Sequence, residues 1–168
     1  MTNANTFIPD LLRRSQVIAV VGLSAKTNRP SHEVADYLQR SGYRIIPVNP
    51  AYAGTHILGE PCYTSLQEAA TAVSKDNVKI DIVDCFRKSD AIVPIAEEAI
   101  AIGARCLWLQ LGVINEQAAA KARANGVDVV MDRCLKIEHA RFCGGLHDAG
   151  FVTGVIDSRR SHLIAVRE

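Results

Sequence analysis

Five short apolar segments recur along the chain, separated by stretches in which apolar residues have helical spacing. The first, VIAVV at residues 17–21, contains no polar residue and is rich in β-branched side chains. This composition is typical of a strand that is covered on both faces within a parallel sheet. Comparable segments fall at residues 44–48, 80–84, 106–109 and 127–131. The pattern therefore predicts a sheet of about five parallel strands.

The segments between the predicted strands favour helices. Val34, Tyr37 and Leu38 have the i, i+3, i+4 spacing of one helix face, and Gly42 follows at the position of a left-handed C-terminal cap. We therefore expect a helix at residues 31–41. Further helices are predicted at residues 65–74, at residues 91–102, between a cap at Asn115 and a stop at Gly126, and in a short leading segment with Pro9 in its first turn.

Strands that alternate with helices at this spacing imply right-handed crossovers between parallel strands. We therefore predict an α/β fold, a Rossmann-like doubly wound sheet with helices on both faces. Pro47 and Pro50 indicate that the chain leaves the sheet at the end of the second strand. No linker divides residues 1–168, so we expect a single domain with its core at residues 8–142. Residues 143–168 lose the periodicity and form a C-terminal extension to which we assign no role.

Composition and charge narrow the classes of partner and location. The 168 residues carry 19 basic and 18 acidic side chains, a formal net charge of +1, so neither a nucleic-acid partner nor an acidic membrane surface is expected. No apolar run approaches the length of a membrane span. The five cysteines are widely spaced and include no CxxC pair, which favours reduced thiols and a cytoplasmic protein.

The loop after the first predicted strand, GLSAKTNRP at residues 22–30, has the character of an anion site. In open parallel sheets, ligands bind outside the carboxyl ends of the strands, and this loop leads there into a helix whose N-terminal N–H groups favour phosphate. Lys26 and Arg29 add positive charge. A plain structural interpretation stays open beside it, in which Gly22 makes a tight turn and both basic side chains are solvated.

The common nucleotide signatures are missing from the sequence. The loop has Ser24 where GxGxxG has its second glycine, and no GxxxxGK motif occurs. The second strand ends at Val48, Asn49 and Pro50 rather than at the acidic residue of an NAD site. Residues 49–56 contain no Lys or Arg for the extra phosphate of NADP. Either a different adenine nucleotide or no nucleotide remains.

Several ordered motifs, taken together, resemble one known family. They are VVGLS, RPSH, GYRIIPVNP, LGEPCYTSL, VDCFRKSD, WLQLGVIN and MDRCLKIEH. In this order they are similar to the CoA-binding protein family, which is related to the CoA-binding Rossmann domain of the succinyl-CoA synthetase α subunit. The resemblance covers residues 8–142 and implies a domain that holds CoA across the carboxyl ends of its strands.

The resemblance also implies a set of CoA-binding residues spread over the loops that follow the strands. The phosphates are expected near Gly22, Leu23, Ser24, Lys26, Arg29, Pro30 and Ser31, and a second wall at Pro47, Val48, Asn49 and Pro50. Phe86, Arg87 and Lys88 follow the third strand, Gln110 and Gly112 the fourth, and Asp132 and Cys134 the fifth. Either Lys26 with Arg29 or Arg87 with Lys88 is suited to the 3′-phosphate of CoA.

Few residues suggest chemistry beyond binding. Cys134 is expected at a helix N-terminus, and the favoured interpretation is a small buried side chain. The alternative is a thiol whose pKa the helix N-terminus lowers, which would allow a mixed disulfide with CoA. Asp84 and Asp132 fall at crevice positions, but no spacing indicates paired acid–base work. Glu138 and His139 are adjacent, so on a helix they point about 100° apart and are expected to cap or to form salt bridges.

We therefore expect a stand-alone module that binds CoA or an acyl-CoA as a small-molecule ligand, with no catalytic residue and no metal assigned. Its 168 residues leave no room for the further domains of the similar synthetase. Two other classes stay open. An oxidoreductase or transferase would need a crevice acid or base of perturbed pKa, and a CoA-sensing regulatory subunit would dock on a protein partner through an apolar patch near residues 150–166.

Overall fold

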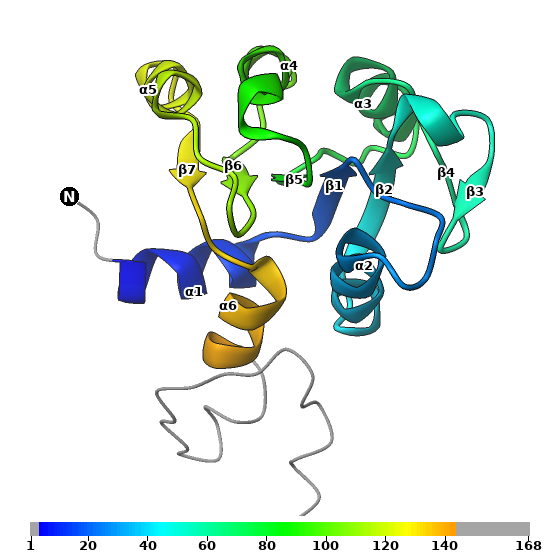
Figure 1. The fold of residues 1–168 in the computed structure, drawn as a ribbon, viewed down its shortest axis with the longest axis horizontal. Coiled ribbons are helices and arrows are strands. Elements are labelled where there is room, and N and C mark those ends of the chain that lie inside the picture. The colour runs from blue at the N-terminus through cyan, green and yellow to red at the C-terminus, as the bar shows by residue number, and fades with distance from the viewer. Residues whose placement is uncertain (1–3, 144–168) are drawn as a thin grey trace, which may run out of the picture.

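The sheet consists of five parallel strands (Figure 1). A computed structural model describes residues 4–143 of the chain. The strands are β1 (Val17–Val21), β2 (Arg44–Val48), β5 (Ile82–Cys85), β6 (Cys106–Leu109) and β7 (Asp128–Val130), in the spatial order β2-β1-β5-β6-β7. Each neighbouring pair is parallel, with Ile18 beside both Ile45 and Ile82. The predicted parallel sheet is confirmed.

Helices cover both faces of this sheet, as predicted. One face carries α3 (Leu66–Ser74), α4 (Ile92–Ala101) and α5 (Glu116–Ala124), and the other carries α1 (Ala4–Arg14), α2 (Pro30–Arg40) and α6 (Leu135–Phe142) (Figure 1). The described residues also include two 3₁₀ turns and a short hairpin, namely η1 (Pro50–Tyr52), η2 (Ser89–Ala91), and β3 (His56–Ile57) with β4 (Glu60–Pro61). The Rossmann-like α/β fold is confirmed.

The apolar run of β1 reflects burial on both faces of the sheet. Val17, Ala19 and Val21 belong to the core that includes residues of α3, α4 and α5. Ile18 and Val20 belong to the core that includes residues of α1, α2 and α6. A strand between two helical layers needs apolar residues at every position, which is why its sequence shows no alternation.

The start of the third predicted strand differs from the prediction. β5 begins at Ile82 rather than at residue 80. Asp81 precedes it, and its carboxylate accepts hydrogen bonds from the backbone N–H groups of Gln16 (2.8 Å) and Val17 (3.0 Å). The other carboxylate oxygen lies 3.4 Å from Nε of Arg105. Asp81 therefore joins the starts of neighbouring strands through its side chain.

The predicted position of Pro9 in the leading helix is wrong. α1 begins at Ala4, so Pro9 lies inside the helix rather than in its first turn. Because Pro9 has no N–H group, the helix lacks one backbone hydrogen bond there. Burial of Ile8, Leu11 and Leu12 in the core offsets that loss.

The chain leaves the sheet after β2, as predicted, but only one of the two prolines marks the exit. Pro50 opens η1, whereas Pro47 pairs with Val20 inside β2. The Pro47 carbonyl accepts a hydrogen bond from the N–H of Tyr63 (3.0 Å), on the side of β2 away from β1. The missing N–H of Pro47 lies on that same side, so the ladder with β1 does not need it.

Within residues 4–143, no helix combines the length and the apolar character that are needed to cross a bilayer. The predicted extension beyond residue 143, with the apolar patch expected near residues 150–166, lies outside the described residues.

Candidate functional site

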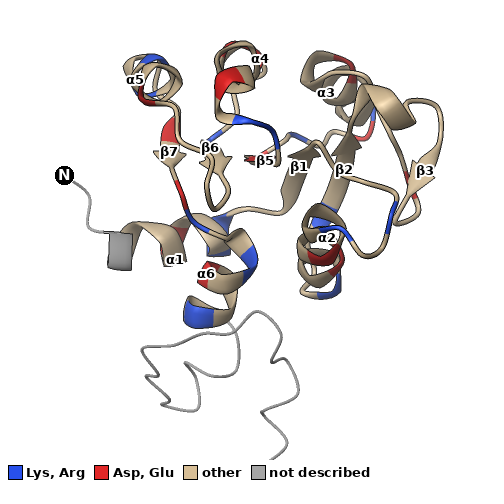
Figure 2. Ribbon diagram, in the orientation of Figure 1, with Lys and Arg blue, Asp and Glu red and all other residues tan. Residues whose placement is uncertain are grey.

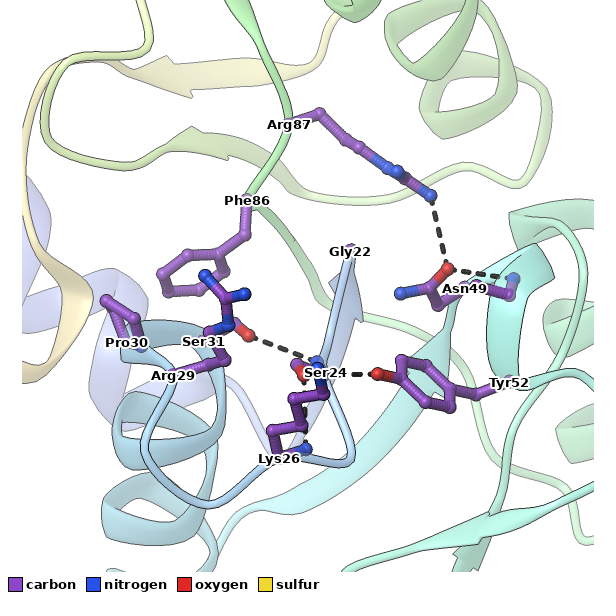
Figure 3. A pocket seen from close by; sticks show the side chains of 11 residues that line it. Gly22, Ser24, Lys26, Arg29, Pro30, Ser31, Asn49, Tyr52, Phe86 and Arg87 are labelled. Carbon is purple, nitrogen blue, oxygen red and sulfur yellow. Dashed lines mark hydrogen bonds between the residues drawn. The ribbon is translucent and has the colours of Figure 1, made fainter.

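Two neighbouring cavities open at the carboxyl edge of the sheet. The first has a volume of about 440 Å³ and lies between the β1–α2 loop, the η1 turn and the chain after β5 (Figure 3). The second has a volume of about 570 Å³ and is lined by α2, the chain after β5, the loop after β6 and the start of α6. Pro30, Phe86 and Arg87 line both cavities. We call the two together the cleft.

The first cavity gathers most of the residues predicted in the first loop. Its lining consists of Gly22, Ser24, Lys26, Arg29, Pro30, Ser31, Asn49, Ala51, Tyr52, Phe86 and Arg87. Three of these side chains are cations and none is a carboxylate. Lys26 and Arg29 come from the β1–α2 loop, and Arg87 comes from the chain after β5 on the opposite side (Figure 3). Figure 2 shows Lys and Arg positions, in blue, in both segments. The cavity is therefore suited to an anion.

Gly22 allows the first loop to pass close to the chain after β5. Its φ is +89°, and a Cβ at this position would lie 2.4 Å from the carbonyl oxygen of Phe86. The Gly22 N–H donates to the carbonyl of Val48 (2.8 Å), and the Phe86 N–H donates to the carbonyl of Val21 (2.8 Å). The ends of β1, β2 and β5 are thus tied together under the first cavity, where only glycine fits.

The substitution Gly22→Ala should lower the free energy of unfolding by about 2 kcal/mol, because the positive φ and the contact with Phe86 both oppose a side chain. Gly42→Ala is the matched control, since Gly42 also has a positive φ (+104°) but a Cβ there meets no atom within 4 Å. It should cost about 1 kcal/mol. Urea denaturation measures both values, and equal losses would show that the close approach to Phe86 is unimportant.

Ser24 holds the first loop in shape. Its backbone N–H donates to Oγ of Ser31 (3.1 Å), and its own Oγ accepts from the N–H of Lys26 (3.1 Å). The same Oγ lies 3.5 Å from the hydroxyl oxygen of Tyr52. Figure 3 shows these interactions along the wall of the first cavity. The loop is therefore ordered by its own polar groups.

The N-terminus of α2 opens onto the first cavity. Its first two residues, Pro30 and Ser31, line the cavity, and the N-cap residue Arg29 makes no side-chain capping hydrogen bond. A helix N-terminus presents N–H donors and the positive end of the helix dipole, both of which stabilise a phosphate. The arrangement expected from the sequence is thus present in the fold.

Asn49 occupies the position where an NAD site would carry a carboxylate. Its Nδ2 donates to the carbonyl of Leu23 (3.0 Å), and its Oδ1 accepts from the N–H of Ala51 (3.0 Å). Nη2 of Arg87 donates to the same oxygen at 3.4 Å (Figure 3). Asn49 therefore holds the η1 turn and Arg87 in place while adding no negative charge to the cavity.

The second cavity has an uncharged floor. Its buried lining side chains are Val34, Gln110, Val113 and Cys134. The charged members of its lining are partly or fully exposed, namely Glu33, Arg87, Lys88 and Lys136. The charged side chains therefore lie at the rim of the second cavity, and uncharged side chains form its floor.

A buried carboxyl group lies behind this floor. Nε2 of Gln110 donates to Oδ1 of Asp84 (2.7 Å), and the other carboxyl oxygen of Asp84 has no hydrogen-bond partner among residues 4–143. Burial raises the pKa of Asp84 to about 7, and the hydrogen bond from Gln110 opposes part of that rise. The prediction that Asp84 faces the crevice is wrong, because its side chain is fully buried and lines neither cavity.

Cys134 is the N-cap residue of α6, as predicted, and it lines the second cavity. Burial raises the pKa of its thiol, although the nearby backbone N–H groups at the start of α6 act in the opposite direction. The favoured interpretation, a small buried side chain, is therefore confirmed, and the alternative of a lowered thiol pKa is wrong. The side chain of Cys134 is only 9% exposed, so desolvation raises its pKa by more than the helix N-terminus lowers it.

Some predicted residues lie beside the cleft instead of on it. Those that line neither cavity are Leu23, Pro47, Val48, Pro50, Gly112 and Asp132. Gly112 donates its N–H to Oδ1 of Asp132 (2.7 Å), so these two residues join the loops after β6 and β7. Lys88 lines only the second cavity, whereas its neighbour Arg87 lines both.

Sequence reasoning missed several residues that line the cleft, and most of them are apolar. The missed lining residues are Glu33, Val34, Ala51, Tyr52, Leu111, Val113, Lys136 and Ile137. Tyr52 had a usable signal, because it is an aromatic residue in the loop directly after the second strand. No sequence signal marked Val34 as a cavity residue, because its helical spacing is the same as that of a core residue.

Glu138 forms a salt bridge, as predicted, whereas His139 makes a hydrogen bond with a tyrosine instead of a cap or a salt bridge. Glu138 is buried, and its Oε1 lies 3.3 Å from Nη1 of Arg133. Nδ1 of His139 lies 3.0 Å from the hydroxyl oxygen of Tyr37. These contacts fasten α6 to α2 and to the loop after β7, and neither residue lines the cleft.

The fold and the cleft define a Rossmann-like domain with a cation-lined cavity at the carboxyl edge of its sheet. The chain belongs to the CoA binding domain family, which matches it over residues 16–140. The protein YneT of Bacillus subtilis (strain 168), itself uncharacterized, is 41% identical over 133 residues, which cover 79% of this chain and 92% of YneT.

Solved structures agree with this assignment. A hypothetical protein from Pyrococcus horikoshii OT3 is 36% identical with a TM-score of 0.74, covering 86% of this chain and 94% of that one. The dinucleotide forming acetyl-coenzyme A synthetase 1 of Ca. Korarchaeum cryptofilum is 20% identical with a TM-score of 0.57, covering 73% of this chain and 28% of that one. At this identity the second likeness concerns the fold alone.

Proposed function

We propose that the cleft binds coenzyme A, with the phosphorylated adenosine in the first cavity and the pantetheine arm in the second. The observation that carries the proposal is the lining of the first cavity, which contains three cations and no carboxylate. Membership of the CoA binding domain family supports the same ligand. CoA is a polyanion joined to an uncharged arm. The first cavity has no carboxylate in its lining, and the second has an uncharged floor with its charged side chains at the rim.

The positions of the cations suggest how the phosphates are shared. The diphosphate would lie against the N-terminus of α2, where the N–H and the hydroxyl of Ser31 meet it. Pro30 has no N–H, and the N–H groups of His32 and Glu33 bond to the carbonyl of Arg29. Lys26 and Arg29 both line the first cavity, whereas Lys88 lines only the second. We therefore assign the 3′-phosphate to Lys26 and Arg29 rather than to Arg87 with Lys88. Tyr52 offers an aromatic face for the adenine.

We propose that this single domain binds its ligand without transforming it and that it works in the cytoplasm. The enzyme alternative needs a crevice acid or base of perturbed pKa. Asp84 has a raised pKa, but it is fully buried behind Gln110 and lines neither cavity. The location follows from the cysteine pattern rather than from the cleft.

A thermal-shift comparison of CoA, dephospho-CoA, NAD, NADP and ADP tests the proposed function. A ligand that binds only the folded state raises the midpoint of unfolding, by an amount equivalent to about 2.7 kcal/mol at 100 times its Kd. CoA should give the largest shift, dephospho-CoA a smaller one, and ADP, which lacks the arm, a smaller one still. A larger shift with NAD or NADP, or none with CoA, would refute the proposal.

A further inference from the structure

We propose that the second cavity holds an uncharged, apolar acyl group on the CoA thiol, so that the preferred ligand is a neutral acyl-CoA. This inference rests on the proposed CoA-binding function. The second cavity joins the first at Phe86 and Arg87 and is the larger of the two, about 570 Å³ against about 440 Å³. A ligand whose phosphates occupy the first cavity therefore directs its thiol end into the second.

The floor of the second cavity is suited to an apolar group. Val34 and Val113 are 6% and 9% exposed and present aliphatic surface, and Cys134 behaves as a small apolar side chain. An acyl chain that covers this surface is stabilised by leaving water. Gln110 is the one amide in this floor, and it can meet the amide or thioester of the arm without a charge.

A carboxylate at the end of the acyl group would be poorly placed. Three cations line this cavity, and none of them is fully buried at its floor. Lys88 is exposed, and Nζ of Lys136 lies 5.4 Å from the centre of the Tyr37 ring, which is outside the cavity. Arg87 is half-buried, and its Nη2 donates to Oδ1 of Asn49 on the side of the first cavity. The Asp84 carboxyl lies directly behind Gln110. An anionic acyl group would thus lose its hydration beside another acid.

Two exposed apolar side chains in the loop after β6 allow a variant and its control to be compared. Leu111 is 61% exposed and lines the second cavity. Ile114 lies in the same loop and is 49% exposed, but it lines neither cavity. An acyl chain in the second cavity would cover part of Leu111 and leave Ile114 in water.

Isothermal titration with CoA, butyryl-CoA and succinyl-CoA tests the proposal. Butyryl and succinyl groups have the same number of carbons and differ in the terminal carboxylate. Butyryl-CoA should bind about tenfold more tightly than CoA, and succinyl-CoA should bind no more tightly than CoA. We call the ratio of the Kd for CoA to the Kd for butyryl-CoA the butyryl advantage. In Leu111→Ser it should fall to about threefold, whereas in Ile114→Ser it should stay at about tenfold.

The outcomes separate this proposal from the function on which it rests. Equal affinity for CoA and butyryl-CoA, or tight binding of succinyl-CoA, overturns the acyl proposal while CoA binding stands. An equal fall of the butyryl advantage in both serine variants overturns the placement of the acyl group beside Leu111. If none of the three ligands binds, the proposed function itself fails.

Discussion

Replacing Lys26 and Arg29 together by alanine should weaken CoA binding by about 100-fold or more, because each charge-assisted contact with a phosphate contributes about 1.5–3 kcal/mol. Both residues line the first cavity and are exposed. Within residues 4–143 neither side chain takes part in a hydrogen bond or an ion pair. The free energy of unfolding should therefore stay within about 0.5 kcal/mol of the original value.

The double variant Lys75→Ala with Arg123→Ala is the matched control. Both of its residues are exposed, it removes the same two charges, and neither residue lines the cleft. Its affinity for CoA should change less than about twofold, because charges farther than a Debye length of about 8 Å are largely screened. Isothermal titration at fixed salt measures both variants. Unchanged affinity in the Lys26 and Arg29 variant would move the phosphate site toward Arg87 and Lys88.

Asp84→Asn should remove a large part of the pH dependence of stability. Burial raises the pKa of Asp84 from 3.8 to about 7. The folded protein therefore holds this proton more tightly than the unfolded chain does. Binding of this proton therefore adds to the free energy of unfolding, on the order of 4 kcal/mol. This stabilisation is complete below about pH 4, falls as the pH rises toward 7, and is lost above that.

Urea denaturation between pH 4 and pH 8 measures this effect. The free energy of unfolding of Asp84→Asn relative to the original protein should rise across that interval, because asparagine does not ionise and its side-chain oxygen can still accept from Gln110. Asp90→Asn changes an exposed carboxyl and serves as the control, with no such rise expected. Parallel pH profiles for the original protein and Asp84→Asn would contradict the burial of an ionisable group at this position.

The helices and strands follow from local patterns, which explains both what the sequence predicts and where it fails. The apolar run of 17–21 and the glycine at position 42 are strong local signals, and both elements form where expected. Pro9 and Asp81 depend on partners far along the chain. The cost of Pro9 inside α1 is offset by core burial, and Asp81 bonds with residues more than sixty positions away.

The first cavity could be predicted because its residues come directly after strands, and the carboxyl ends of parallel strands meet at one edge. The same rule finds the part of the second cavity that follows strands, such as Arg87, Lys88 and Gln110. Its apolar part could not be predicted, since Val113 and Ile137 have the same pattern as core residues and only the packing leaves them facing a cavity. The alternative of a lowered thiol pKa at Cys134 fails for a related reason. A sequence shows the position at a helix N-terminus, but it does not show whether burial outweighs that position.

A crystal structure of the protein with CoA tests the central claim most directly. We expect the diphosphate against the N-terminus of α2, close to Lys26 and Arg29, and the pantetheine arm passing Phe86 into the second cavity. Crystals grown with saturating CoA that show the first cavity without phosphate, or CoA bound away from the carboxyl edge of the sheet, would contradict it.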